Sequence, residues 1–304
     1  MLKSLRSHRI LSITTLLYTL AVILWGAFVR ATGSGAGCGD HWPLCNGNVL
    51  PRSPTLETII EFTHRFTSGI LLMLMVLWVV SAFRAFPKKH PARTTVVWSA
   101  IFLVIEALLG AGLVIFEMVA DNPSLARGWW AAAHLANTMI LLGWMALTVA
   151  FGWRMETRRP VLAGPWAWRF AVALLLLVIA GSAGAVAALG NTLFPADTLV
   201  RGMRMDFDPA SNILVRLRVL HPIAAALAAA WLFYLSITFS SDDRAKVRVW
   251  ATLLGALVLA QVLAGIVNLM LLAPVWMQLS HLLLADGVWM ATVLLGALVL
   301  TRND

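Results

Sequence analysis

Long apolar segments separated by short polar connections run through the whole sequence. Eight of these segments reach the roughly 20 residues that an α-helix needs to cross the hydrocarbon core of a bilayer. They lie at about residues 11–29, 61–83, 95–117, 127–151, 167–190, 214–239, 247–272 and 276–300. Almost no chain is left for a soluble domain, and 60% of the 304 residues are hydrophobic while 12% are charged. The pattern therefore predicts an all-α integral membrane protein with eight transmembrane helices.

The basic residues gather in alternate connections between these segments. Of the 23 Lys and Arg residues, 15 fall on one side of the alternation. The positive-inside rule places that side in the cytoplasm, together with both chain termini. The net charge of +9 therefore indicates topology and not a nucleic-acid-binding surface. The residues on this side are Lys3, Arg6, Arg9, Arg84, Lys88, Lys89, Arg93, Arg154, Arg158, Arg159, Arg169, Arg244, Lys246, Arg248 and Arg302.

Four of the seven histidines lie inside predicted spans, at His64, His134, His221 and His281. They occupy the second, fourth, sixth and eighth spans, which enter the membrane from one side if consecutive spans alternate in direction. Ionisable residues inside a span are costly and often mark functional sites. Two pairs of imidazoles at similar depth match the axial ligands of two haems. The alternatives are hydrogen bonds between helices, metal transport and a proton relay.

The eight spans also read as one four-helix unit that occurs twice. Each unit holds an even number of spans, so both have the same orientation and are related by a pseudo-twofold axis along the membrane normal. We expect two four-helix bundles, at residues 1–160 and 161–304, with one haem site in each. We interpret the small residues of the repeat as close packing between helices. Corresponding positions are His64 and His221, His134 and His281, Gly26 and Gly184, and Gly110 and Gly265.

The two cysteines, Cys38 and Cys45, lie together in the connection after the first span. The predicted topology places this connection in an oxidising compartment, where paired thiols form disulfides. A metal site that includes His41 is the alternative, although two thiolates and one imidazole leave a zinc ion short of a ligand. We therefore expect a disulfide between Cys38 and Cys45.

The two halves differ beside their first histidine. Glu61 precedes His64 by three residues and shares its helix face, whereas Arg218 has the corresponding position before His221. A carboxylate beside a haem can handle protons or charge during a reaction. A guanidinium in that place is suited to pair with haem propionates. We expect a reactive N-terminal half and a stable haem site in the C-terminal half. The alternative for Glu61 is an acid at a helix start, favoured by the helix dipole.

Other polar side chains lie inside predicted spans near the histidines. Asn137 and Thr138 follow His134 by three and four residues and share its helix face. Glu106 and Asp286 lie on the third and eighth spans. Each of these residues can orient a ligand, move a proton or form a hydrogen bond between helices. Their roles stay open, as does that of the connection at 191–213.

With these residues in place, the chain resembles the haem A synthase family, especially its bacterial members. The resemblance covers essentially the whole chain. Its first two motifs are specific, whereas the C-terminal ones are weak on their own. The motifs are GSGAGCGDHWPLC at 33–45, EFTHRFTSG at 61–69, ALLGA at 107–111, HLANT at 134–138 and the histidines of the sixth and eighth spans. The chain lacks the second cysteine pair that many bacterial relatives carry after the fifth span.

The resemblance implies an enzyme that oxidises the C8 methyl group of haem O to a formyl group, which gives haem A. It implies that His64 and His134 flank the substrate haem and that Glu61 is catalytic. It also implies that His221 and His281 hold the iron of a resident haem b, and that the cysteine pair is the disulfide of the family. The implied location is the plasma membrane of a prokaryote.

Other classes of membrane protein remain as alternatives. A di-haem cytochrome would use the same histidines for electron transfer, although haems that pass electrons across a membrane usually lie at two depths. A transporter would have its site near the midplane, deeper than these histidines. A haem O synthase would need Asp-rich motifs on cytoplasmic connections, and Asp242 and Asp243 alone do not supply them.

The expected partners follow from the membrane location and from the resemblance. Haem O and membrane lipid are expected. Haem O synthase, an unidentified electron donor and a second copy of the chain are candidates. No nucleic acid is expected.

The predicted topology can be tested by thiol labelling in a background without Cys38 and Cys45. Single cysteines at Ser53 or Ser124 should react with a membrane-impermeant reagent added to intact cells. A cysteine at Thr157 should react only after the membrane is opened, because the basic connections stay in the cytoplasm. The reverse pattern would contradict the predicted orientation.

Overall fold

The computed structural model describes residues 2–153 and 162–301 of the chain. Within these residues, eight helical segments are long and apolar enough to cross a membrane, which confirms the predicted spans. The sixth span is made of α7 (Ile213–Arg216), a 3-10 turn and α8 (Leu220–Phe239). The other spans are α1 (Leu2–Ala31), α2 (Leu56–Ala85), α3 (Pro91–Ile115), α4 (Leu125–Gly152), α5 (Pro165–Leu193), α9 (Ala245–Met270) and α10 (Val275–Leu300). Arg154, Thr157, Arg158, Arg159 and Arg302 lie outside the described residues.

Several helices begin before their apolar segments, at polar or proline residues that favour a helix start. The Thr55 hydroxyl accepts a hydrogen bond from the N–H of Thr58 at the start of α2 (3.3 Å), and Ser124 accepts one from Arg127 at the start of α4 (3.2 Å). Both α3 and α5 have proline in their first turn. The first N–H groups of a helix have no partner within the helix. A capping hydroxyl accepts a hydrogen bond from one of them, and a proline in the first turn has no N–H that needs a partner. The helices therefore begin a few residues earlier than the hydrophobic pattern predicts.

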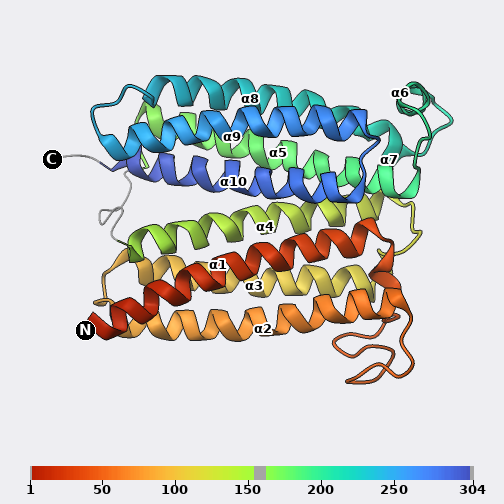
Figure 1. The fold of residues 1–304 in the computed structure, drawn as a ribbon, viewed down its shortest axis with the longest axis horizontal. Coiled ribbons are helices and arrows are strands. Elements are labelled where there is room, and N and C mark those ends of the chain that lie inside the picture. The colour runs from red at the N-terminus through yellow and green to blue at the C-terminus, as the bar shows by residue number, and fades with distance from the viewer. Residues whose placement is uncertain (1, 154–161, 302–304) are drawn as a thin grey trace.

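The helices form two groups of four that lie side by side, with α1–α4 in one and α5, α8, α9 and α10 in the other (Figure 1). In the first group α1 packs on α2 and α4, and α3 packs on α2 and α4. In the second group α5 packs on α8 and α10, and α9 packs on α8 and α10, which is the same pattern. The two groups meet through α1, α4, α5 and α10. The residue 160/161 boundary falls outside the described residues, and the assignment of one haem site to each half stays a prediction.

The hydrophobic clusters of both groups extend from the end of the molecule where α1 begins and α10 ends to about the middle of the spans. On the four helices that carry the predicted histidines, every cluster residue comes after the histidine, toward that end. Trp78 of α2 and Leu295 of α10 are examples of fully buried side chains in these clusters. The helices are therefore held together at one end by apolar packing, and the histidines lie at the other end.

A disulfide joins Cys38 and Cys45 in the connection after α1, which confirms the predicted pairing. Because both sulfur atoms are used, the alternative metal site with His41 does not form. The part of the chain that the structure describes contains no group of three or more His, Cys, Asp or Glu side chains placed to hold a metal ion.

The connection at 191–213 contains a short helix, α6 (Leu199–Phe207), which the hydrophobic pattern does not predict. It is seen nearly end-on in Figure 1 and so runs across the direction of the spans. Val200, Met203 and Phe207 follow the helical repeat, and all three are exposed. A short helix with one exposed apolar face beside a transmembrane bundle is typical of a helix in the membrane interface.

Removal of the disulfide should loosen the loop but leave the spans folded. The two cysteines are 7 residues apart, and closing so short a loop contributes about 2–3 kcal/mol on chain-entropy grounds. The Cys38→Ser, Cys45→Ser double variant should be cut faster by protease within 33–55, with unchanged helix content by circular dichroism. Mass spectrometry that finds two free thiols in protein from native membranes would contradict the disulfide.

Candidate functional site

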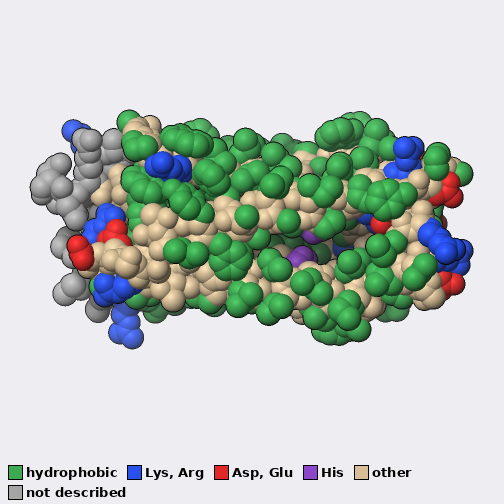
Figure 2. All heavy atoms as spheres, turned by 90° about the horizontal axis from the view of Figure 1, so that it is seen from above, with side chains coloured by type: hydrophobic (Ala, Val, Ile, Leu, Met, Phe, Trp, Pro, Cys, Tyr) green, Lys and Arg blue, Asp and Glu red, His purple; other side chains and the backbone are tan. Residues whose placement is uncertain are grey.

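The four predicted histidines lie at one end of the bundle, each within about the first three turns of its span. This is the end that carries the disulfide loop and α6 (Figure 1). Seen from above, histidine side chains are visible in a hollow between hydrophobic side chains (Figure 2). The histidines are thus at similar depth, as the alternation of the spans predicts.

His221 of α8 and His281 of α10 face each other in the C-terminal half. Their ring centroids are 6.3 Å apart and their planes are at 87°. Since a metal–imidazole bond is about 2 Å long, one metal atom between two such ligands separates the ring centroids by roughly 6 Å. The spacing of this pair therefore fits two axial ligands of one haem iron.

The hydrogen bonds of this pair fix which ring nitrogen of each imidazole carries the proton. Nδ1 of His221 is 3.0 Å from the Ala180 carbonyl oxygen, which can only accept, so this nitrogen carries the proton. The Gln261 amide nitrogen, which can only donate, is 3.3 Å from Nε2 of His281. In both rings Nε2 is then the unprotonated nitrogen, which is the form that binds a metal.

In the N-terminal half, His64 of α2 and His134 of α4 lie close enough to interact electrostatically. Nδ1 of His134 is 3.0 Å from the Glu106 carboxylate of α3, although the two groups are not aligned for a hydrogen bond. Asn137 donates a hydrogen bond to the same carboxylate (2.6 Å), and so does the Thr138 hydroxyl. The structure thus brings together four polar residues whose roles the sequence left open or assigned separately.

A carboxylate and an amide occupy corresponding places in the two halves. Glu106 lies beside His134, and Gln261 lies beside His281 at the corresponding position of the repeat. A carboxylate beside a metal-binding imidazole raises the basicity of that ligand, whereas a neutral amide does so less. The N-terminal site therefore carries a carboxylate where the C-terminal site has a neutral amide. This difference has the same direction as the predicted one, in which Glu61 of the N-terminal half corresponds to Arg218.

A glycine faces each of the four imidazoles. We expected the small residues to serve helix packing in general, but these glycines have the more specific role of contacting the histidine rings. A Cβ atom on Gly26 would lie 3.0 Å from the His64 ring, and one on Gly184 would lie 3.0 Å from the His221 ring. For Gly265 and His281 the distance is 3.1 Å, and for Gly110 and His134 it is 3.8 Å. These glycines leave room for the imidazole rings, and their spacing in the repeat was the signal in the sequence.

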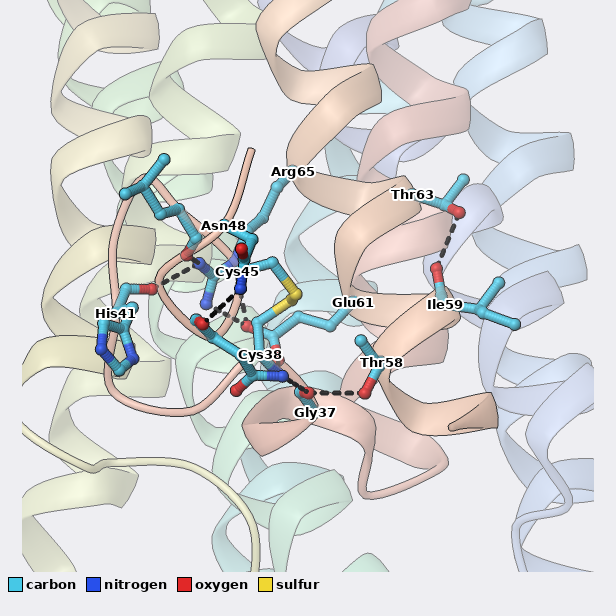
Figure 3. Close-up of a disulfide and its surroundings, with 12 residues drawn as sticks. Gly37, Cys38, His41, Cys45, Asn48, Thr58, Ile59, Glu61, Thr63 and Arg65 are labelled. Atoms are coloured by element: carbon cyan, nitrogen blue, oxygen red, sulfur yellow. Dashed lines mark hydrogen bonds and ion pairs between the residues drawn. A yellow bond between two sulfur atoms is a disulfide. The ribbon is translucent and has the colours of Figure 1, made fainter. Parts of the chain in front are cut away.

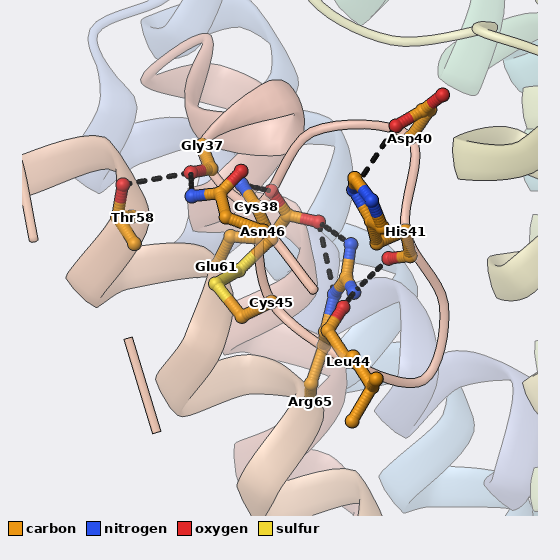
Figure 4. Close-up of polar contacts among 10 residues, drawn as sticks. All are labelled: Gly37, Cys38, Asp40, His41, Leu44, Cys45, Asn46, Thr58, Glu61 and Arg65. Carbon is orange, nitrogen blue, oxygen red and sulfur yellow. Dashed lines mark hydrogen bonds and ion pairs between the residues drawn. A yellow bond between two sulfur atoms is a disulfide. The ribbon is translucent and has the colours of Figure 1, made fainter. Parts of the chain in front are cut away.

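Glu61 is buried at the outer end of α2 and binds the disulfide loop (Figure 3). One carboxylate oxygen accepts a hydrogen bond from the backbone N–H of Cys38 (2.8 Å). The other accepts two from the Arg65 guanidinium, at 3.0 and 2.5 Å. Arg65 also donates to the carbonyl oxygens of His41 (2.5 Å) and Leu44 (2.7 Å), as Figure 4 shows.

Glu61, one turn outward from His64, and Arg65, the residue after His64, together hold the loop on α2. The i, i+4 spacing of Glu61 and Arg65 was the signal in the sequence for this ion pair. No hydrogen bond joins Glu61 to His64 within the described residues, and the catalytic role of Glu61 stays a prediction. The carboxylate is in any case fixed in position by the loop.

Arg218 ties α6 to the helices of the C-terminal half. Its guanidinium donates to Asp206 (2.8 Å), to the Asn191 side chain (2.8 Å) and to the Gly202 carbonyl oxygen (3.3 Å). The predicted contact with a haem propionate is not tested by these bonds, which use three of the five guanidinium N–H groups.

Asp286 is buried on α10, and one of its carboxylate oxygens has no hydrogen-bond partner.

Residues 9–293 match the family model described as "Cytochrome oxidase assembly protein" (COX15-CtaA). A protein of Thermus thermophilus named protoheme IX farnesyltransferase is 44% identical over 257 residues, which are 83% of this chain and 42% of that protein. The chain therefore spans less than half the length of this relative, and the name of the relative applies to that longer protein.

Proteins named heme A synthase match shorter parts of the chain. The protein of Shouchella clausii is 43% identical over 131 residues, which are 43% of either chain. That of Halalkalibacterium halodurans is 35% identical over 141 residues, which are 46% of this chain and 47% of that protein.

Alanine substitutions should disturb the protein most at the glycines that lie closest to a histidine ring. Gly26→Ala and Gly184→Ala should displace His64 and His221, at a cost of about 1–3 kcal/mol for overpacking. Gly184→Ala should accordingly lower the Soret absorbance of any haem that copurifies with the protein. Gly69→Ala is the control, because a Cβ there meets nothing within 4 Å. An unchanged Soret band in Gly184→Ala would contradict the tight fit.

Proposed function

Because the chain belongs to the COX15-CtaA family of cytochrome oxidase assembly proteins, the haem A synthase family, we propose that it oxidises the C8 methyl group of haem O to a formyl group. The observation that carries this proposal is the difference between two otherwise corresponding histidine pairs. A carboxylate lies beside the N-terminal pair, and an amide lies beside the C-terminal pair. Two equal haem sites would not need this difference.

The N-terminal pair is the proposed substrate site. His64 and His134 would bind haem O, which must enter and leave as haem A. Glu106, held by Asn137 and Thr138, would orient His134 and raise its basicity.

The C-terminal pair is the proposed cofactor site. The spacing of the His221 and His281 rings supports a resident haem b, and so does the unprotonated Nε2 of each, although Gln261 would have to release Nε2 of His281 for the iron to bind there. When bound, haem iron supplies the one-electron and oxygen chemistry that side chains lack. The proposed role of the protein here is to hold the two imidazoles at a fixed spacing.

Glu61 is the proposed acid–base residue of the substrate site. It lies on the helix face of His64, one turn toward the loop. The N–H of Cys38 and the Arg65 guanidinium hold its two oxygens in place. A positioned carboxylate can accept or return a proton as the methyl group is oxidised. The disulfide loop would then serve to fix this carboxylate and to limit the access of water to it.

The proposed setting is a prokaryotic plasma membrane, with the disulfide loop outside and haem O delivered from the membrane. The Thermus relative supports a haem-farnesylating enzyme as the partner that supplies haem O, because that relative is named protoheme IX farnesyltransferase.

The two sites should respond differently to loss of a histidine. His221→Ala or His281→Ala should lose the haem b that copurifies with the protein, since one axial ligand holds a porphyrin less firmly than two. His64→Ala or His134→Ala should keep this haem and abolish conversion of added haem O to haem A. Pyridine haemochrome analysis and chromatography of extracted haems measure both. If all four variants keep haem b and activity, the assignment of the sites is wrong.

Glu61→Gln should retain both haem sites and lose most haem A formation. Loss of a positioned acid–base group commonly costs about 100- to 10,000-fold in rate. Glu57→Gln is a matched control, because Glu57 is exposed one turn earlier on α2. Arg65→Gln tests whether Glu61 acts in catalysis or only holds the loop. If Glu61→Gln and Arg65→Gln lose haem A formation equally, and protease cuts the loop equally fast in both, then Glu61 only holds the loop. Near-normal haem A formation by Glu61→Gln with both haems bound would remove the catalytic role of Glu61, whereas wild-type protein that binds both haems and forms no haem A would favour a di-haem electron-transfer cytochrome.

A further inference from the structure

The Arg30 side chain crosses from one four-helix group to the other, one turn outward from the histidines. Arg30 lies in the last turn of α1, in the N-terminal half. Its guanidinium donates to the Ala188 carbonyl oxygen and the Thr192 hydroxyl of α5, both at 2.9 Å, and to the Gln278 side chain of α10 at 2.8 Å. All three acceptors belong to the C-terminal half.

These acceptors lie one helical turn outward from the C-terminal histidine pair. Ala188 follows Gly184 by four residues on α5, and Gly184 packs against the His221 ring. Gln278 precedes His281 by three residues on α10, on the same helix face. The guanidinium therefore lies about 5 Å above the imidazoles, on the side of the loops.

The charge of Arg30 has no anionic partner in the described residues. Its three acceptors are a carbonyl, a hydroxyl and an amide oxygen, and the nearby Arg127 guanidinium adds a repulsive interaction. Arg218 at the same level differs, because it already pairs with Asp206. A partly buried cation without a counter-ion inside a membrane bundle is costly and indicates that an anion is missing.

We propose that Arg30 binds a propionate carboxylate of the haem held by His221 and His281, so that the N-terminal half completes the cofactor site of the C-terminal half. This inference rests on the proposed haem b site. A haem carries two propionates at one edge, and a guanidinium binds a carboxylate with paired, charge-assisted hydrogen bonds. Arg30 uses three of its five N–H groups on the protein, which leaves two for such a pair.

The position of Arg30 also explains a break in the repeat. The residue that corresponds to Arg30 in the C-terminal half is Ala188, and the two are in direct contact through the Arg30 hydrogen bond. Corresponding residues that touch lie next to the pseudo-twofold axis, where the space holds one long side chain and not two. One arginine therefore serves the C-terminal site, and the N-terminal site receives none from this position.

The test compares haem b with its dimethyl ester, which keeps the iron and ring but lacks both carboxylates. Full-length protein is reconstituted with either compound, and the dissociation rate of each is measured by transfer to a haem-binding acceptor protein. The variants are Arg30→Gln, which keeps N–H donors but loses the charge, and Arg30→Lys, which keeps the charge. Thr192→Val is the control, because it removes one partner of Arg30 and leaves the guanidinium.

Wild-type protein and Thr192→Val should release the ester at least tenfold faster than haem b, because one charged hydrogen-bonded pair is lost. In Arg30→Gln this preference should fall at least tenfold, and Arg30→Lys should restore part of it. A preference for haem b that is the same in Arg30→Gln and wild type overturns the proposal, whatever the thermal stability of the variants. Wild-type protein that holds neither compound would instead overturn the haem b site itself.

Discussion

An imidazole inside a membrane bundle needs a partner for its ring nitrogens, and the rest of this structure is arranged around that requirement. Four helices each place one histidine near the same end of the molecule. The apolar clusters lie beyond the histidines on all four helices and hold the bundle together at the opposite end. The apolar clusters and the histidines are thus separated along the helix axis. In the proposed function, this separation lets the haem-binding end open without loss of the bundle.

The repeat places equivalent histidines in equivalent surroundings, and the differences between the halves then carry the information about function. Glycine faces the ring in each case, so the space is conserved between halves. The charges are not: Glu106 stands against Gln261, and Glu61 against Arg218. Each change replaces an acidic group of the N-terminal half by a neutral or basic one. These changes are the support for the proposed substrate site that handles protons and the proposed permanent haem site beside it.

Each half fixes its outer connection with an arginine–carboxylate pair. Arg65 and Glu61 hold the disulfide loop on α2, and Arg218 and Asp206 hold α6 on the C-terminal half. The second half therefore has an ionic contact in the connection where many bacterial relatives carry a second cysteine pair. Both pairs are largely buried, so loss of one partner would leave the other charge buried and unpaired, which is strongly destabilising.

The hydrophobic pattern determined the eight spans and, through their alternation, the similar depth of the four histidines, because both depend on span length alone. The disulfide was predictable because its two cysteines are only 7 residues apart in one connection. The short helix α6 escaped prediction because it is too short to show a span and follows a mixed polar pattern. The contact of glycine with imidazole, the Glu106–His134 approach and the crossing of Arg30 to α5 and α10 were decided by the tertiary structure. They depend on which faces of distant helices meet, and packing between helices sets those faces, which no local pattern in the chain records.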